Sequence, residues 1–399
     1  MSKLIQHLAR EHYHRKGFSP FYAEKMPEWL HEDFFRVKAP LKKKLWAHKR
    51  GFMSYKVDYY QLTDENYQDF LPDMEYYRMH PINGAFSHWI DDKLTIRYLL
   101  HPFKDYLPEY YFHLYHGEVL RLADCPETCD ASIDSLVQLI ENKGVLAVKK
   151  MIGSHGEGFI KLVHDGHQFL VNDNALSKET LISNLQEWTD SPGSGYLVTE
   201  YLKPCQEFAR IWPNTANTLR VVVLRNKNKP ATIVDAFARF GTTDTGNVEA
   251  SSLRGITCRV HLNDGYYGDA KVFDNRKVIE MTYHPDTGVL IEGYVPRWDE
   301  IKAKIVEISN FLPHLIYMGY DLVITNEGFK IIEINSHQGI GFNQTHTPFL
   351  KSPLTKDFFN DQLARIRQED LNRKSNRLVN KLIRFLKKTK HELSLLLKR

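Results

Sequence analysis

The spacing of apolar and polar residues along the chain predicts a mixture of helices and strands. Apolar residues recur at helical intervals over residues 91–107, 134–142, 177–188 and 298–312. Shorter apolar or alternating runs, typical of strands, occupy residues 145–150, 159–163, 195–202, 219–224, 231–240, 316–325 and 329–335. Because these elements do not alternate strictly as strand, helix, strand, the pattern favours an α+β fold.

The two ends of the chain differ from this central part. Residues 1–84 are predicted to be mostly helical, with many aromatic and basic side chains and several prolines that interrupt the pattern. Residues 366–399 are predicted to form a basic amphipathic tail, because apolar residues recur there at near-helical spacing with Lys and Arg between them. We therefore expect both ends to be regions separate from the central part.

Composition indicates a globular protein with more than one folded unit. The chain has 399 residues, of which 42% are hydrophobic and 26% charged. It contains no run of about 18 apolar residues, the length that a membrane-spanning helix requires. Its first residues alternate polar and apolar types too often for a secretory signal. We therefore expect a cytoplasmic protein, and in that reducing compartment the four cysteines, which lack CxxC spacing, would remain thiols.

The positive charge of the chain is concentrated in the tail. Residues 373–399 contain ten Lys or Arg and a single acid, whereas the whole chain has a net charge of +4. The rest of the chain is therefore net negative, which argues against a nucleic-acid-binding protein. The tail itself has two interpretations: it lies on an anionic membrane surface, or it packs on the negative body of the protein. The first would place the protein at the inner face of the cell membrane.

The most informative segment for chemistry is the last predicted strand pair. If residues 326–328 form a three-residue hairpin loop, Thr325 lies opposite Phe329 and Asp321 lies opposite Glu333. Side chains alternate between the two faces of a strand. The two carboxylates are therefore predicted to lie together on one face of the sheet.

Asn335 follows Glu333 at a spacing of two and joins this face. Two carboxylates and an amide oxygen form the hard, all-oxygen ligand set that Mg²⁺ prefers when it also holds phosphate. Two carboxylates this close would repel each other without a cation between them. The alternative is a solvated sheet face with charges at alternate positions.

A glycine-rich loop, Gly153-Ser154-His155-Gly156-Glu157-Gly158, separates the strands predicted at 145–150 and 159–163. Glycines allow backbone N–H groups to approach phosphate oxygens closely. Lys149 just before the loop would neutralise phosphate charge. An ordinary glycine-rich hairpin remains the alternative, because the pattern matches neither a Walker A motif nor a dinucleotide fingerprint.

The strand end at residues 199–202 is a third candidate. Backbone groups at an exposed strand end can hydrogen bond to an adenine base. Taken alone, the segment favours a plain core strand over an adenine site. Its interest comes from its position between the glycine loop and the carboxylate hairpin.

These residues together resemble the ATP-grasp superfamily over about residues 91–335. That resemblance implies two α+β lobes clasping ATP, with the N-terminal part and small lobe at 85–205 and the C-terminal lobe with the magnesium site at 206–365. It implies that ATP and Mg²⁺ are bound. The matching motifs imply that Lys93 and Lys149 bind the phosphates and that Glu200, Tyr201 and Leu202 bind the adenine. They imply that Glu207 binds the ribose and that the metal is held by Asp321, Glu333 and Asn335.

A closer resemblance is to the sugar-transfer-associated ATP-grasp proteins and to those of teichuronopeptide synthesis. It rests on the strand at 217–222, on Phe240-Gly241 after Arg239, and on the final hairpin. Residues 247–250 depart from the pattern of those proteins. The resemblance implies an ATP-dependent carboxylate–amine ligase of bacterial capsule or other surface polysaccharide synthesis, which joins an amine or amino acid to a uronic acid or related carboxylate.

The mechanism implied is activation of a carboxylate as an acyl phosphate, followed by attack of an amine. Arg220 is the main candidate for stabilising developing negative charge, because its guanidinium offers a fixed fork of donors. Arg239 and Arg254 are weaker candidates, and His155 and His337 could move protons or contact phosphate. Two alternatives remain open: a phosphotransferase on the same fold, and a non-catalytic nucleotide-binding component of a glycan-assembly complex.

Overall fold

The computed structural model describes residues 3–153 and 158–373. Contacts within the chain divide these residues into two compact units. The first contains residues 3–57, 61–81 and 348–373, and the second contains residues 58–60 and 82–347. Residues 348–365, predicted from the sequence to lie in the C-terminal lobe, belong to the same unit as the N-terminal helices.

The first unit is helical throughout its described regular structure. A small core gathers Phe18, Tyr22, Ala23, Met26 and Met53, and the buried carboxylate of Asp33 accepts hydrogen bonds from Ser54 and His48. Its elements are α1 (Lys3–Arg15), α2 (Pro20–Phe35), α3 (Leu41–Lys49), η1 (Tyr67–Asp69), α5 (Asp73–Arg78) and a helical segment at 353–373, while α4 (Lys56–Tyr59) lies at the boundary between the units.

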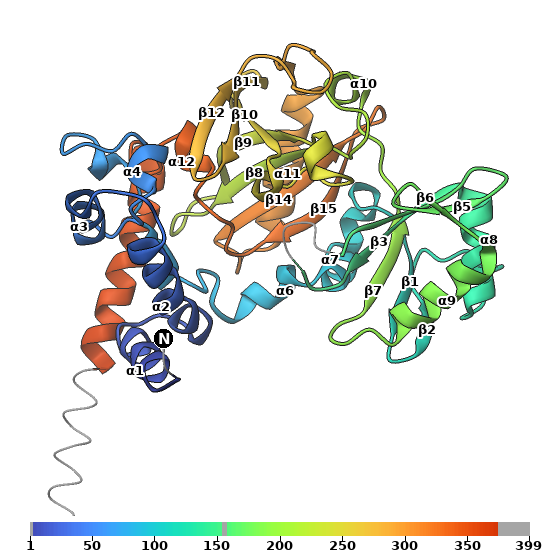
Figure 1. Ribbon diagram of the computed structural model, residues 1–399, viewed down its shortest axis with the longest axis horizontal. Coiled ribbons are helices and arrows are strands. Elements are labelled where there is room, and N and C mark those ends of the chain that lie inside the picture. Colours follow the sequence, from blue (N-terminus) through green and yellow to red (C-terminus); the bar gives the residue numbers. More distant parts are fainter. Residues whose placement is uncertain (1–2, 154–157, 374–399) are drawn as a thin grey trace, which may run out of the picture. The chain divides into compact units, whose positions relative to one another are not determined.

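The second unit contains two antiparallel sheets (Figure 1). The smaller has the strand order β2-β1-β7-β3-β4-β5-β6. Apolar residues of helices α8 and α9 pack on one face of it, against Leu146, Val148 and Val198. The bounds are β1 (Tyr110–Tyr115), β2 (Glu118–Arg121), α8 (Ile133–Lys143), β3 (Val145–Lys150), β4 (Ile160–His164), β5 (Phe169–Val171), β6 (Asn174–Leu176), α9 (Lys178–Thr189) and β7 (Tyr196–Glu200).

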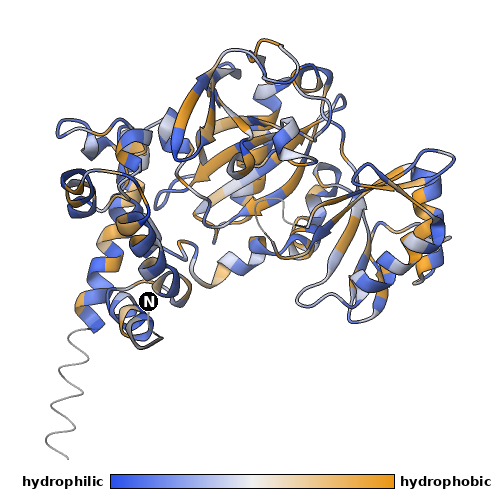
Figure 2. Cartoon of the chain, viewed as in Figure 1, coloured by the Kyte–Doolittle hydropathy of each residue, from blue (hydrophilic) through white to orange (hydrophobic). Residues whose placement is uncertain are grey.

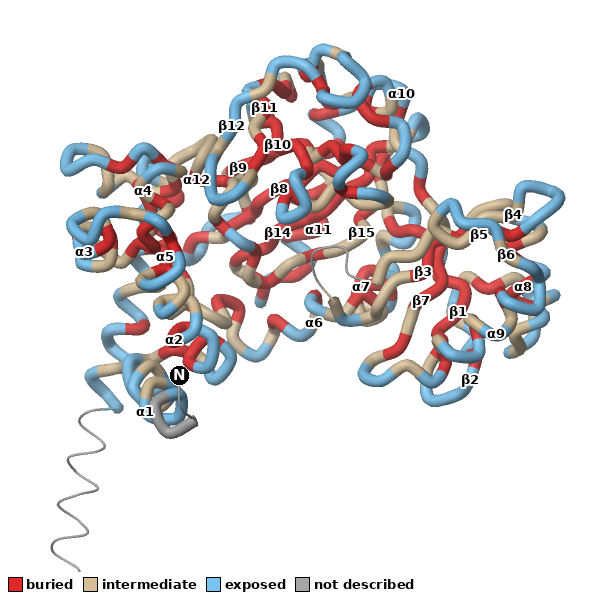
Figure 3. The backbone as a smooth tube through the Cα atoms, in the orientation of Figure 1, coloured by how far each residue is buried: buried red, intermediate tan, exposed pale blue. Residues whose placement is uncertain are grey.

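The larger sheet has the order β12-β11-β10-β9-β8-β14-β15, and β13 pairs with β11. Helix α11 (Trp298–Phe311) buries Ile301, Ile305 and Ile308 in the main core on one face. Its central strands are mostly apolar and buried (Figures 2 and 3). The bounds are β8 (Thr218–Leu224), β9 (Thr232–Phe240), β10 (Ile256–Val260), β11 (Tyr266–Asp274), β12 (Lys277–Met281), β13 (Gly293–Tyr294), β14 (Tyr317–Ile324) and β15 (Phe329–Asn335).

Short helices connect these layers. Helix α7 (Lys93–Leu99) begins at Asp92, whose carboxylate accepts from the backbone N–H groups of Leu94 and Thr95. The others are η2 (Gly84–Ser87), α6 (His88–Asp91), η3 (His101–Tyr106), α10 (Gln206–Ala209), η4 (Thr243–Thr245), η5 (Ser251–Leu253) and α12 (Asn343–His346). No described helix combines the length and the apolar composition that crossing a membrane requires.

The last hairpin differs from the sequence prediction at its turn but agrees with it at the carboxylates. The prediction that Thr325 pairs with Phe329 is wrong, because Ile324 pairs with Phe329 and four residues form the loop. A β-bulge then inserts one extra residue into β15 between the partners of Leu322 and Asp321. Asp321 therefore lies opposite Glu333, as predicted. Without the bulge, Glu333 would lie on the other face of the sheet.

Asn217 fixes the start of β8. Its backbone has a φ of 41°, in the left-handed region that asparagine tolerates better than most residues. Its fully buried side chain donates to the carbonyls of Phe208 and Trp212 and accepts from the Thr215 hydroxyl and the Gly241 N–H. One side chain thus holds together the segments that precede β8 and follow β9.

Replacing Asn217 with Ala should reduce the free energy of unfolding by about 2 to 4 kcal/mol, because several buried polar groups lose their partner. Urea denaturation of the full chain measures this. Asn228→Ala is the matched control, because Asn228 also has a positive φ, 59°, but is exposed. The free energy of unfolding of the control should fall by no more than about 1 to 2 kcal/mol, which is the cost of placing alanine at a positive φ. Equal losses in the two variants would show that the side-chain bonds of Asn217 contribute little.

Candidate functional site

Cross-strand pairing places the polar residues of the large sheet on the face opposite α11. Asp321 pairs with Glu333 on one side and with Arg220 on the other, and Arg220 pairs with Phe237. Directly opposed residues in an antiparallel sheet share a face. Register alone therefore brings two acids and an arginine, from three strands, to one place.

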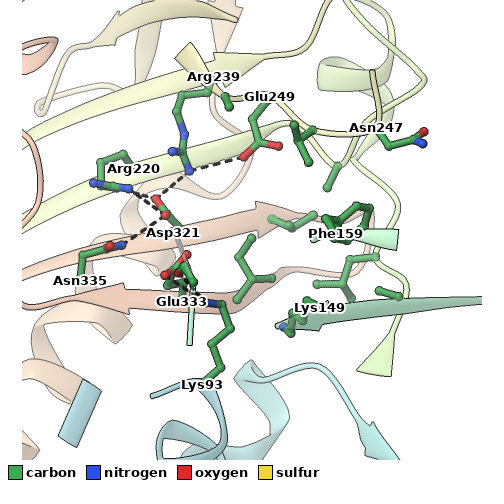
Figure 4. A pocket seen from close by; sticks show the side chains of 18 of the residues that line it. Lys93, Lys149, Phe159, Arg220, Arg239, Asn247, Glu249, Asp321, Glu333 and Asn335 are labelled. Carbon is green, nitrogen blue, oxygen red and sulfur yellow. Dashed lines mark hydrogen bonds and ion pairs between the residues drawn. The ribbon is translucent and has the colours of Figure 1, made fainter. Parts of the chain in front are cut away.

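This face forms one wall of a cavity of about 350 Å³ (Figure 4). The small sheet contributes a second wall, because Ala147, Lys149 and Thr199 alternate with the core residues of β3 and β7 and line the cavity. The cavity therefore lies between the two sheets of the second unit. Most of the predicted site residues line it: Lys93, Lys149, Gly153, Glu200, Tyr201, Leu202, Arg220, Arg239, Asp321, Glu333 and Asn335.

Asp321 is the centre of an ion-pair network. Nε and Nη2 of Arg220 donate to its two carboxylate oxygens at 2.5 and 2.8 Å, and Nη2 of Arg239 lies 2.8 Å from Oδ1. Burial favours the neutral carboxyl, but the two guanidinium groups outweigh it and hold the pKa of Asp321 below its ordinary value. Asp321 is therefore ionised at neutral pH, and it fixes both arginines in the cavity.

Glu333 and Asn335 complete the predicted triad. Nζ of Lys93 lies 3.3 Å from Oε1 of Glu333 and donates to the Gly153 carbonyl at 3.2 Å. Nδ2 of Asn335 donates to Oδ2 of Asp321 at 3.4 Å. The three side chains converge, as predicted from their spacing.

The chemistry of this donor set fits Mg²⁺, since it supplies two carboxylates and an amide oxygen. Lysine and arginine side chains balance the two acids in the structure. Among the described residues no group of three or more His, Cys, Asp or Glu side chains is arranged to hold a metal. The triad contains only two such side chains, because its third member is Asn335.

Lys149 is the most strongly perturbed cation of the cavity. Burial, and then the neighbouring charge of Lys93, lower its pKa to about 7, while Glu333 acts in the opposite direction. Its Nζ lies 5.4 Å from the centre of the Tyr110 ring. A lysine with this pKa gains its proton when an anion enters, so it is suited to hold a phosphate group.

The glycine loop is described at its two ends. Gly153 lines the cavity. Gly158 has a φ of 73°, and a Cβ there would lie 2.9 Å from the Lys150 side chain, so glycine is favoured over residues with a side chain at this position. The predicted phosphate contacts of Ser154, His155 and Gly156 lie outside the described residues.

The strand end at 199–202 lies at the cavity, where it was predicted to hold adenine. The backbone N–H of Glu200 donates to the Glu109 carbonyl at 2.9 Å, and Oε2 of Glu200 accepts from the Glu109 N–H at 3.2 Å. Glu207 is different: it is exposed at the start of α10 and is not among the residues that line the cavity. The structure therefore gives no support to a ribose contact by Glu207.

The weaker candidates separate into two groups. His337 lines the cavity beside the triad. Arg254 is exposed, pairs with Asp244 at 2.8 Å and does not line the cavity. Position alone therefore keeps His337 as a candidate and gives Arg254 no role in the site.

Two further residues were not found from the sequence. Oε1 of Glu249 accepts from the Thr218 hydroxyl at 2.8 Å and lies 3.5 Å from Nη2 of Arg239. Oε1 of Gln338 accepts from Nη1 of Arg220 at 2.8 Å. Glu249 belongs to the loop at 247–252 that lines the cavity. Neither contact leaves a local signal, because the partners are separated by long stretches of sequence.

Comparison with protein families gives one extended match. The model described as sugar-transfer associated ATP-grasp matches residues 75–354, more than half of the chain. A search of the curated proteins found no significant match.

Solved structures are similar at low identity. D-alanine–D-alanine ligase from Bacillus anthracis is 13% identical, with a TM-score of 0.33, and the match covers 72% of this chain and 69% of that chain. D-alanyl-alanine synthetase A from Vibrio cholerae is 14% identical, with a TM-score of 0.40 and coverage of 71% and 67%. N5-carboxyaminoimidazole ribonucleotide synthetase from Thermotoga maritima is 11% identical, with a TM-score of 0.31. The match covers 62% of this chain and only 42% of the Thermotoga protein.

The lowered pKa of Lys149 predicts how nucleotide binding depends on pH. Above about pH 7 the free protein holds Lys149 neutral, and a bound phosphate favours the ammonium form, so binding must take up a proton. Affinity should then fall by up to about tenfold per pH unit between pH 8 and 9. Calorimetry in buffers of different ionisation enthalpy measures the proton uptake. In Lys149→Arg, which stays charged, the dependence should flatten; an unchanged slope would exclude Lys149 as the titrating group.

Proposed function

Because the chain belongs to the sugar-transfer-associated ATP-grasp family, we propose that it is an ATP-dependent ligase that joins a carboxylate to an amine. The observation that carries this proposal is the convergence of Asp321, Glu333 and Asn335 with four cations in one cavity. Those cations, Lys93, Lys149, Arg220 and Arg239, suit the charge of a triphosphate.

Each wall of the cavity has a part in binding ATP. Backbone groups of residues 200–202 hold the adenine at the strand end. Lys149 and Lys93 bind phosphate oxygens from the small sheet and from α7. Asp321, Glu333 and Asn335 would hold Mg²⁺, which when bound neutralises charge on the β- and γ-phosphates.

The reaction proposed has two steps. An oxygen of the substrate carboxylate attacks the γ-phosphorus of ATP. The bond between this phosphorus and the oxygen that joins it to the β-phosphate breaks, so ADP departs and the substrate becomes an acyl phosphate. The amine nitrogen then attacks the acyl carbon, phosphate leaves with the electrons of the C–O bond, and the nitrogen loses a proton. The first step depends on positioning and charge neutralisation more than on covalent participation of the protein.

Arg220 is placed to stabilise the charge that develops in these steps. Asp321 and Gln338 bond its guanidinium from two sides and fix its plane. A donor fixed before the reaction needs no reorganisation during it. Arg239 is held in the same way by Asp321 and Glu249, so both guanidinium groups can act on the transferred phosphoryl or on the tetrahedral intermediate.

The substrate class and cellular place are proposed from the family alone. A sugar-transfer-associated family is consistent with capsule or other surface polysaccharide synthesis, with a uronic acid or related carboxylate and an amine or amino acid as substrates. We place the protein in the cytoplasm, with peripheral membrane contact through the tail. Residues 374–399 of that tail lie outside the described residues.

Glu333→Gln should abolish ATP turnover, because it removes one of the two carboxylate charges of the proposed magnesium site. ADP release by the purified protein, measured over a panel of uronic acids mixed with amino acids, tests this. The ligase releases ADP and phosphate only when both an acid and an amine are present. Retained phosphate on the product would indicate a phosphotransferase instead.

The matched control is Glu327→Gln, which removes an exposed carboxylate from the same hairpin at its turn. It should leave ADP release unchanged. Turnover in Glu333→Gln equal to that of the control would show that the triad does not take part in the reaction.

A further inference from the structure

A second cavity, of about 510 Å³, lies on the same face of the large sheet as the first. Arg220 pairs with Phe237, and Phe237 pairs with Arg259. In the next row Arg239 pairs with Thr257, which pairs with Lys271. Two rows of side chains therefore run from the proposed nucleotide site to this second cavity, which Arg259 and Lys271 line.

Among the residues that the structure describes, no carboxylate forms an ion pair with Arg259, although Asp235 lies close enough for the two charges to interact. Within residues 3–153 and 158–373 its guanidinium forms no ion pair and no hydrogen bond, although it is half-buried. Asp235 lies two residues from Phe237 on β9 and thus on the same face, but its carboxyl accepts from Asn343 at 2.8 Å. Burial raises the pKa of Asp235 to about 7, so it is only a partial counter-charge.

Two other nitrogen groups lie beside Arg259. Nζ of Lys271 donates to the Thr345 carbonyl at 2.7 Å, which brings the ammonium group against the segment that carries His346. Nε2 of His346 lies 3.3 Å from the Thr257 hydroxyl, and in the described part of the chain its buried Nδ1 has no hydrogen-bond partner. Burial, Lys271 and Arg259 lower the pKa of His346 to about 3, so the ring is neutral.

The cavity also has acids among its lining residues, and one of them, Glu280 on β12, lies directly opposite Lys271 on β11. Asp269, Glu280 and Glu292 are exposed, where water and salt screen their charge. Arg259, Lys271 and His346 are half-buried and less screened. Two half-buried cations and one ring nitrogen thus line the cavity together with these three exposed acids.

We propose that this second cavity binds an oxyanion of the acceptor substrate, a carboxylate or a phosphate remote from the reacting group. Arg259 and Lys271 hold the oxyanion, and Nδ1 of His346 bonds a neighbouring polar group. Two strand spacings, about 10 Å, separate Arg220 from Arg259. The acceptor is therefore an extended molecule with a second negative charge about that far from the atom that reacts.

That the ligand is the acceptor substrate rests on the proposed function. Whether the second cavity binds an oxyanion can be tested independently of that function. The probe is inorganic phosphate, titrated and followed by ³¹P NMR with the first cavity filled by magnesium and a non-hydrolysable ATP analogue. Arg259→Gln should weaken phosphate binding by about tenfold, because it removes the fork of donors. Lys277→Gln, an exposed cation on β12 that does not line the cavity, should bind as the wild type does.

Equal phosphate binding in Arg259→Gln and wild type would overturn the proposal, as would no binding in wild type. Lys271→Met gives a second variant in case Arg259→Gln does not fold, and it should weaken binding similarly. Adding glucuronate tests whether the cavity prefers a carboxylate. Glucuronate should displace the bound phosphate if it does, and the phosphate should stay bound if the cavity prefers phosphate. If the nucleotide analogue does not bind, the proposed function fails. The second cavity can still be judged in that case, because phosphate bound there is lost in Arg259→Gln and phosphate bound in the first cavity is not.

Discussion

The buried carboxylate of Asp321 and the two arginines bonded to it are the interaction on which the site depends. A buried carboxylate without partners would be protonated or would strongly destabilise the fold. Here Arg220 and Arg239 meet it at 2.5 to 2.8 Å and keep it charged. The same contacts fix both guanidinium groups in the cavity before any ligand enters.

Sheet register supplies this network without any loop. β8, β9, β14 and β15 are neighbours in one antiparallel sheet, so residues far apart in sequence lie opposite one another. One face of that sheet carries the core against α11, and the other carries the charges. A shift of one residue in any of these strands would exchange the two faces, so the packing of the core also enforces the geometry of the site.

Strand alternation, which has a short and regular period, correctly predicts that Glu333 and Asn335 share a face of the sheet. Asp321, Glu333 and Asn335 were placed together correctly, although the predicted turn was one residue too short and a bulge in β15 restored the pairing. Gln338 and Glu249 could not be predicted, because their contacts with Arg220 and Arg239 depend on how distant segments pack. The alternating pattern also could not show that residues 348–365 join the N-terminal helices.

The motif at residues 217–222 has a role in stabilising the fold in addition to supplying Arg220. Asn217 precedes the strand that carries Arg220, and the hydrogen bonds of its buried side chain hold the backbone around β8. The following residues supply Arg220 for the cavity. Fold and chemistry are thus specified by neighbouring positions of the same short segment.

The central claim is that the cavity around Asp321 binds ATP together with Mg²⁺. Calorimetric titration of ATP into the full chain, once with Mg²⁺ and once with a chelator, tests it most directly. We expect one ATP per chain with Mg²⁺ and much weaker binding in the chelator, because no metal then neutralises the phosphates and links them to Asp321 and Glu333. Absence of binding, or binding of equal strength in the two conditions, would contradict the account.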